Sequence, residues 1–271
     1  MLSLLGALHE RLLPLLAMRL SHSMLHPMDW GMTELIVLGV VSQLGLEAYS
    51  HLLPRVLDGG QYLAARGKPL KEFATIDRVF VAISRFAIVV MTFHYIQFMA
   101  CSPNVVWSLG QVTFWNTCIA LPALFIVYDL FYAPFHRALH HRAIYGFVHK
   151  HHHRQVVPTR GNADAINVHP FEFILGEYNH LLAIFLVSRY IVSCHVIAGF
   201  LFLVIGGAVA TLNHTRLDLS FLRIPFTDIP VFGVRAHDTH HAIPNSNYGQ
   251  YIMLWDYVMG TYKAHPQDKV N

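Results

Sequence analysis

The sequence predicts an all-α integral membrane protein, a helical bundle of four to five spans with a histidine-lined polar cap. Composition, apolar windows and the placement of histidine support this fold class. The chain is 54% hydrophobic and only 13% charged, which is too apolar for an ordinary soluble domain. Half of its 20 histidines lie in two short polar windows, residues 136–153 and 237–241.

Four apolar windows are candidates for membrane spans, because a spanning helix needs roughly 20 mostly apolar residues. Three of them lie near residues 33–49, 79–100 and 111–131. The fourth, residues 181–212, is too long for one untilted span and long enough for a tight helical hairpin that bends near Ser193, Cys194 and His195. Four or five spans are therefore expected.

The charges in the loops predict how these spans are oriented, because Lys and Arg are retained on the cytoplasmic side. The loop after the first span is basic, whereas residues 101–110 carry no charge. The basic residues of that first loop are Arg55, Arg66, Lys68, Lys71 and Arg78. This alternation predicts a multi-pass protein with both histidine windows on the cytoplasmic side.

The remaining bulk features are less specific. The first thirty residues are leucine-rich but interrupted by polar residues, which favours an interfacial amphipathic helix over a secretory signal. Cys101, Cys118 and Cys194 are scattered without CxxC spacing and are interpreted as packing residues. A net charge of +3 without a basic, aromatic-rich run gives no reason to expect a nucleic-acid partner.

The spacing of the clustered histidines predicts a site for two metal ions. His136 and His140 are four residues apart and share one helix face. An HxxHH pattern then occurs twice, and imidazoles on adjacent helical residues point about 100° apart, so that neighbours can face different metals. The expected ligands are His136, His140, His149, His152, His153, His214, His237, His240 and His241. Nitrogen ligands alone suit iron, zinc, copper or nickel.

Two carboxylates are candidates for supporting these ligands. Asp129 lies on the same helical stripe as His136 and His140, where it can accept the distal N–H of a metal-bound imidazole. Asp238 lies inside the third histidine box. Isolated histidines elsewhere, including His94 and His195 in or beside apolar windows and His265, are interpreted as ordinary residues.

As a set, these motifs resemble the fatty acid hydroxylase superfamily of membrane di-iron proteins, which includes methylsterol oxidases and sterol desaturases. The resemblance extends over residues 129–262, about half of the chain. It rests on the first box from Asp129 to His140, the HKxHH box 149–153, the HPxE segment 169–172, the third box 237–241, and the closing NYG and WD…GT stretches at 247–251 and 255–261.

The resemblance implies that these histidines hold two iron ions, with dioxygen as cosubstrate and electrons from a small haem or iron–sulfur protein and its reductase. The implied reaction is hydroxylation or desaturation of a membrane lipid, fatty acyl or sterol-like, with no catalytic side chain beyond the ligands. It also marks His169 and Glu172 as supporting residues, although Pro170 and Glu172 equally fit the start of a helix. We expect one domain, with an amino-terminal membrane region (1–128) and a histidine-box region (129–262).

Two other classes of function compete with this interpretation. The first is a membrane metal transporter, or a metal-binding protein without oxygenase activity. A transporter would place its ligands within the spans, whereas these boxes lie outside the apolar windows. A zinc hydrolase is disfavoured because the sequence has no HExxH motif. The sequence leaves open the lipid substrate and the position attacked, hydroxylation versus desaturation, the electron donor, the oligomeric state and the membrane.

Overall fold

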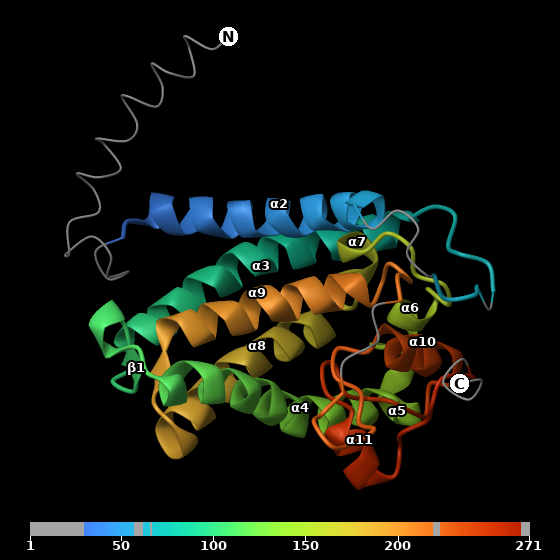
Figure 1. The fold of residues 1–271 in the computed structure, drawn as a ribbon. Coiled ribbons are helices and arrows are strands. Elements are labelled where there is room, and N and C mark those ends of the chain that lie inside the picture. The colour runs from blue at the N-terminus through green and yellow to red at the C-terminus, as the bar shows by residue number, and fades with distance from the viewer. Residues whose placement is uncertain (1–29, 57–61, 66, 219–222, 267–271) are drawn as a thin grey trace.

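A computed structural model describes residues 30–56, 62–65, 67–218 and 223–266, and four of its helices are long and apolar enough to cross a membrane (Figure 1). These four segments are Met32–Leu53, Thr75–Cys101, Trp115–Leu139 and Pro170–Ile191. A shorter apolar helix, Val196–Leu212, packs among them. The predicted helical membrane bundle is thus confirmed, while the interfacial helix expected before residue 30 lies outside the described residues.

The bundle is built from five long elements whose bounds follow the apolar windows. They are α2 (Met32–Val56), α3 (Thr75–Cys101), η3 (Trp115–Ile119) continuing into α4 (Ala120–Leu139), α8 (Pro170–Leu186) continuing into η4 (Val187–Ile191), and α9 (Val196–Leu212). Helix α2 packs on α3 and α9, and α4 packs on α8 and α9. Aromatic rings fill the centre, where Phe125 meets Phe202 and Tyr251 edge-on at centroid distances of 4.9 and 5.0 Å.

The predicted helical hairpin is present, and it bends where expected. After η4 the chain forms β2 (Cys194–His195), which pairs in parallel with β1 (Val105–Val106) beside η2 (Leu109–Gln111). His195 caps α9, because its Nδ1 accepts the backbone N–H of Ile197 at 3.2 Å while Nε2 contacts the carbonyl of Ser108. This histidine is therefore a structural cap of the hairpin.

The first helix of that hairpin begins at Pro170, not near residue 181 as the apolar window predicts. Polar residues lower the hydropathy of residues 170–180, but several of these side chains are buried with partners. Asn179 donates to the carbonyl of Tyr128 at 2.8 Å, and His180 bonds to the Tyr251 hydroxyl at 3.0 Å. Satisfying these groups inside the bundle removes most of the cost of burying them.

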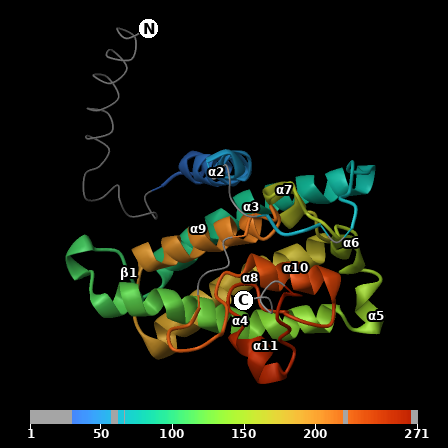
Figure 2. The ribbon, with the colours of Figure 1, turned by 45° about the vertical axis from the view of Figure 1, so that its right-hand side comes forward.

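Five short helices gather at the end of the bundle opposite β1 (Figures 1 and 2). They are α5 (Arg142–Tyr145), α6 (Lys150–His153), α7 (Asn162–Ala165), α10 (Val234–Ala242) and α11 (Leu254–Met259). The chain reaches this end after α2, α4 and α9 and leaves it along α3 and α8. Both histidine windows thus lie at the same end of the bundle, as the alternating spans predict.

Candidate metal centre

The structure gathers all nine predicted ligands into two groups of imidazoles. Within each group the nitrogen atoms able to bind a metal lie within 4.8 Å of one another. The first group is His136, His140, His149, His153 and His240, and the second is His152, His214, His237 and His241. Except for the partly exposed His140, the rings of the first group are buried.

Each HxxHH box is divided between the two groups. In the box at α6, His149, which precedes the helix, and His153 join the first group, whereas His152 joins the second. Helix α10 has the opposite division, because His240 joins the first group, whereas His237 and His241 join the second. The rings of His153 and His241, from different groups, have centroids 5.0 Å apart. The angular separation of adjacent helical residues thus produces two neighbouring sites.

Backbone carbonyls fix the protonation of several rings. His136 Nδ1 donates to the carbonyl of Tyr248 at 2.9 Å, and His240 Nδ1 donates to that of Ser246 at 2.7 Å. In the second group, His214 Nδ1 donates to the carbonyl of Ala210 at 2.8 Å. A carbonyl oxygen only accepts, so each of these neutral rings carries its proton on Nδ1 and presents a bare Nε2 lone pair.

The Nε2 atoms of these rings converge at short distances. His136 Nε2 lies 3.0 Å from the Nε2 of His149, whose own Nδ1 bonds to the Glu172 carboxylate at 2.7 Å. His153 Nε2 lies 3.0 Å from His149 Nε2 and 3.1 Å from His240 Nε2, and a single proton cannot bridge both gaps. Converging, unprotonated nitrogen atoms are the donor set of a transition metal, so the residues fit such an ion.

Burial keeps these rings neutral, which is the form that binds metal. Loss of solvent lowers the pKa of His153 from 6.5 to about 3 and that of His140 to about 2. The pKa values of His152, His240 and His241 are lowered well below 6.5, again chiefly by desolvation and then by neighbouring imidazoles. Neutral rings at physiological pH can therefore bind a metal without first losing a proton.

Asp129 supports the first group less directly than its helical position predicts. Its buried carboxylate accepts the backbone N–H groups of Gln250, Tyr251 and Ile252 at 2.8, 2.9 and 2.6 Å, and these partners replace the expected imidazole. That segment follows Tyr248, whose carbonyl fixes His136. Asp129 thus holds in place the backbone segment that follows the carbonyl acceptor of His136.

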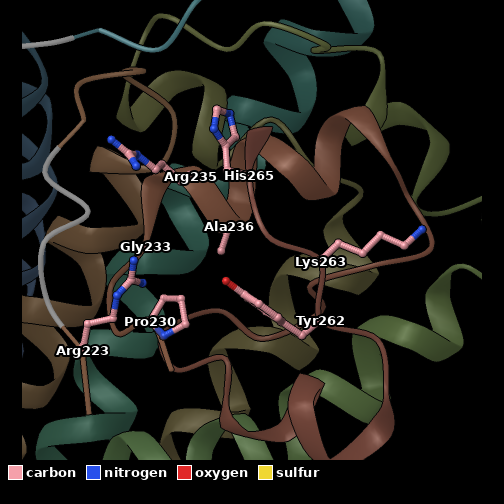
Figure 3. Close-up of a pocket in the computed structure, with 8 residues that line it drawn as sticks. All are labelled: Arg223, Pro230, Gly233, Arg235, Ala236, Tyr262, Lys263 and His265. Carbon is pink, nitrogen blue, oxygen red and sulfur yellow. The ribbon is translucent and has the colours of Figure 1, made fainter. Parts of the chain in front are cut away.

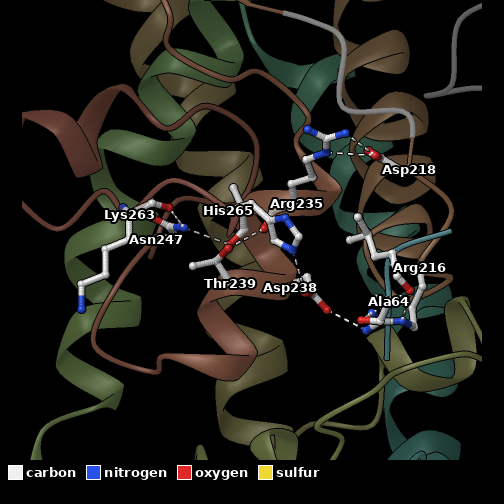
Figure 4. A network of polar contacts seen from close by, with 11 residues as sticks. Ala64, Arg216, Asp218, Arg235, Asp238, Thr239, Asn247, Lys263 and His265 are labelled. Atoms are coloured by element: carbon white, nitrogen blue, oxygen red, sulfur yellow. Dashed lines mark hydrogen bonds and ion pairs between the residues drawn. The ribbon is translucent and has the colours of Figure 1, made fainter. Parts of the chain in front are cut away.

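Asp238 anchors helix α10 through its carboxylate. Figure 4 shows it between Arg216 and His265, which it meets at 2.6 and 3.2 Å. All three residues are buried. Asn247 adds a second anchor, because its side-chain amide donates to the carbonyls of Ala236 and Lys263.

The HPxE segment, residues 169–172, both starts a helix and supports the metal site, which are the two roles that the sequence allows. His169 caps α8 by accepting the Phe171 N–H at 3.2 Å, and Pro170 occupies the first helical position. Glu172, one turn later, is buried and bonds to His149. His169 therefore starts the helix, and Glu172 positions a ring of the first group.

Sequence reasoning missed several supporting residues. The carbonyls of Ala210, Ser246 and Tyr248 carry no side-chain signature, and Arg216 and His265 lie outside every motif. A small pocket behind α10, lined by residues that include Arg223, Arg235 and Lys263, measures about 10 Å³ (Figure 3). That volume holds about one water molecule, so this pocket is no lipid cavity.

The geometry defines a helical membrane protein with paired all-histidine sites, and comparisons with known proteins place it in a family. The fatty acid hydroxylase family profile matches residues 121–261, which contain all nine histidines. The chain therefore belongs to the fatty acid hydroxylase family.

Several curated relatives are also similar to this chain. Lathosterol oxidase from Rattus norvegicus is 31% identical over 144 residues, covering 48% of this chain and 40% of the relative. A Delta(7)-sterol 5(6)-desaturase from Leptosphaeria maculans is 29% identical (58% and 40% covered), and a fatty acid hydroxylase from Mycosarcoma maydis is 30% identical (55% and 33% covered). The matches thus span less than half of the length of these relatives. No solved structure matches the chain.

Proposed function

We propose that this protein is a membrane oxidoreductase that hydroxylates or desaturates a lipid, fatty acyl or sterol-like. Two iron ions held by the nine grouped histidines would supply the activation of dioxygen, using electrons from a small haem or iron–sulfur protein and its reductase. The observation that carries the proposal is the pair of adjacent groups of converging, neutral imidazoles. The names of the relatives, sterol desaturase and fatty acid hydroxylase, support the class of reaction.

The chain's own residues would prepare this chemistry. Carbonyls of Tyr248 and Ser246 hold two rings in one tautomer, and Glu172 holds a third. Buried surroundings exclude water from most of the rings, which limits side reactions of activated oxygen. Residues 129–262 would supply the metal centre, and residues 1–128 would complete a single domain in the membrane.

The site lies where α4 and α9 leave the apolar bundle, a position that suits a lipid entering from the bilayer while electrons arrive from water. We assign this end to the cytoplasmic side, because Lys68 and Lys71 lie in the connection between α2 and α3, and Arg55 and Arg78 lie in the adjoining turns of these helices. A metal transporter is less well supported, since it needs ligands along a route through the bilayer.

The test compares two histidine substitutions in the purified full chain and in cells. His240→Ala removes a ring of the first group, and His141→Ala removes an exposed ring that caps α5. We expect the parent and His141→Ala proteins to bind two iron ions per chain and to form a lipid product, one oxygen atom heavier or two hydrogen atoms lighter than its substrate. The His240→Ala protein should insert but form no product, and normal product formation by it would contradict the proposal.

A further inference from the structure

A second pocket, outside the histidine groups, lies where two spans begin. Its volume is about 260 Å³, and its lining includes Ile76, Phe80, Phe147, Lys150, Arg154 and His169. Ile76 and Phe80 lie in the first two turns of α3, and His169 caps α8. The pocket therefore lies at the boundary between the apolar bundle and the histidine end.

The walls of this pocket have two kinds of chemistry. Ile76, Phe80 and Phe147 form an apolar side, and Phe147 is 85% exposed. Lys150 and Arg154 supply two cationic groups, both exposed. Apolar side chains beside cations at a span boundary suit an amphiphile better than a fully polar ligand.

The nearby acid, Asp77, pairs with only one of the two cations. Asp77 is 1% exposed, and its carboxylate accepts from the Ala74 N–H and the Asn167 amide at 2.8 and 3.1 Å. It lies 3.0 Å from His151 Nε2. It also lies 3.5 Å from Arg154 Nη1. Lys150 has no acidic partner among the described residues. A positive charge therefore remains available to a ligand.

A neutral hydrogen-bond donor accompanies that charge. His169 Nδ1 accepts the Phe171 N–H at 3.2 Å, so the proton of the neutral ring is on Nε2. An ammonium, a guanidinium and an imidazole N–H all donate and none accepts. An anion with several acceptor oxygen atoms, such as a phosphate or carboxylate, matches this set.

The size of the pocket further restricts the ligand. A volume of about 260 Å³ is below the range of pockets that enclose a drug-sized ligand. It accommodates a head group without its tail. Exposed apolar residues of α3, namely Ile76, Val79, Ile83 and Phe86, continue from the pocket along the helix at spacings of three and four.

We propose that this pocket binds the anionic head group of a membrane lipid, whose tail lies in the bilayer along α3. Lys150 and Arg154 hold the acidic oxygen atoms, His169 donates a further hydrogen bond, and Phe147 covers the junction of head group and tail. This assignment needs neither bound metal nor turnover, so it stands or falls independently of the proposed oxidation.

The test measures binding of short-chain lipids to the full chain in a neutral detergent. Dihexanoyl phosphatidic acid, dihexanoyl phosphatidylcholine and inorganic phosphate are titrated calorimetrically. We expect phosphatidic acid to bind more tightly than either of the others. Lys150→Gln should weaken its binding on the order of five- to tenfold through loss of a charged hydrogen bond. Lys68→Gln removes an exposed lysine that does not line the pocket, and it should leave the affinity unchanged.

Two results would overturn the proposal. Equal affinities of the Lys150→Gln and Lys68→Gln proteins would show that the lipid binds elsewhere. Inorganic phosphate that binds as tightly as phosphatidic acid would reduce the pocket to a general anion site. Thermal unfolding of both variants provides the control for folding, because Lys150 is exposed and has no ion pair with the part of the chain that the structure describes.

Discussion

The two histidine groups differ in how firmly the protein holds their rings. In the first group, acceptors at Tyr248, Ser246 and Glu172 fix the Nδ1 atoms of three rings. In the second, the carbonyl of Ala210 fixes one ring of four, that of His214. Buried Nδ1 atoms without a hydrogen-bond partner among the described residues occur in both groups, at His153 in the first and at His152 and His241 in the second. Supporting hydrogen bonds orient rings and strengthen metal binding. The first site is thus more completely preorganised, and the second depends more on its metal.

Loss of a ligand from either group gives the largest expected effect. His153→Ala and His241→Ala should both abolish product formation, because the proposed reaction needs both metal ions. The difference between the two groups predicts that the two variants retain different amounts of iron, measured as iron per chain after chelator treatment. The His241→Ala protein should retain one iron ion in the first group, whereas the His153→Ala protein should lose both. Equal retention by the two proteins would contradict the proposed difference.

Acid should empty the second site first. The folded protein keeps its rings neutral, with the pKa of His153 lowered to about 3, whereas unfolded histidine binds a proton near pH 6.5. The unfolded chain therefore binds more protons in this range, so the metal-free fold loses stability as the pH falls from about 6.5 towards 3. Protonation competes with metal binding in the same direction. Iron content measured across this range should fall in two steps, and a single step would contradict the comparison.

Breaking the anchor of α10 should weaken both sites together, because this helix serves both groups. Arg216→Met leaves the buried Asp238 carboxylate without its arginine partner, which costs about 3–5 kcal/mol in comparable buried pairs. We expect a lower midpoint of thermal unfolding and reduced iron in both sites. Arg235→Gln, which breaks the more exposed pair with Asp218, is the matched control and should have a much smaller effect.

Glu172→Gln should affect the first site selectively. The neutral amide weakens the charged bond to His149, and losses of such supporting groups reduce metal affinity by about 10–100-fold. Competition with a chelator should show the weaker binding at one of the two sites. Glu72→Gln, in an exposed loop, should leave both affinities unchanged. An equal decrease at both sites would show that Glu172 acts on the whole fold.

Much of this arrangement can be predicted because it depends on periodicity. Apolar windows locate the spans, and HxxHH spacing distributes neighbouring rings between two sites. The carbonyl acceptors cannot be predicted in this way, since every residue has a carbonyl and tertiary folding selects which one meets a ring. The start of α8 at Pro170 is hidden because Asn179 and His180 read as polar, although the bundle satisfies them. Asp129 lies on the helix that carries His136, as predicted, but it binds amides that lie about 120 residues away.

The division of each HxxHH box between the groups has a thermodynamic consequence. Helices α6 and α10 each contribute rings to both sites, so a rotation of either helix disturbs both coordination spheres at once. An ion that orders one site therefore restrains the rings of its neighbour and reduces the entropy still to be lost there. Such linkage means that an ion bound in the first site raises the affinity of the second site for its ion.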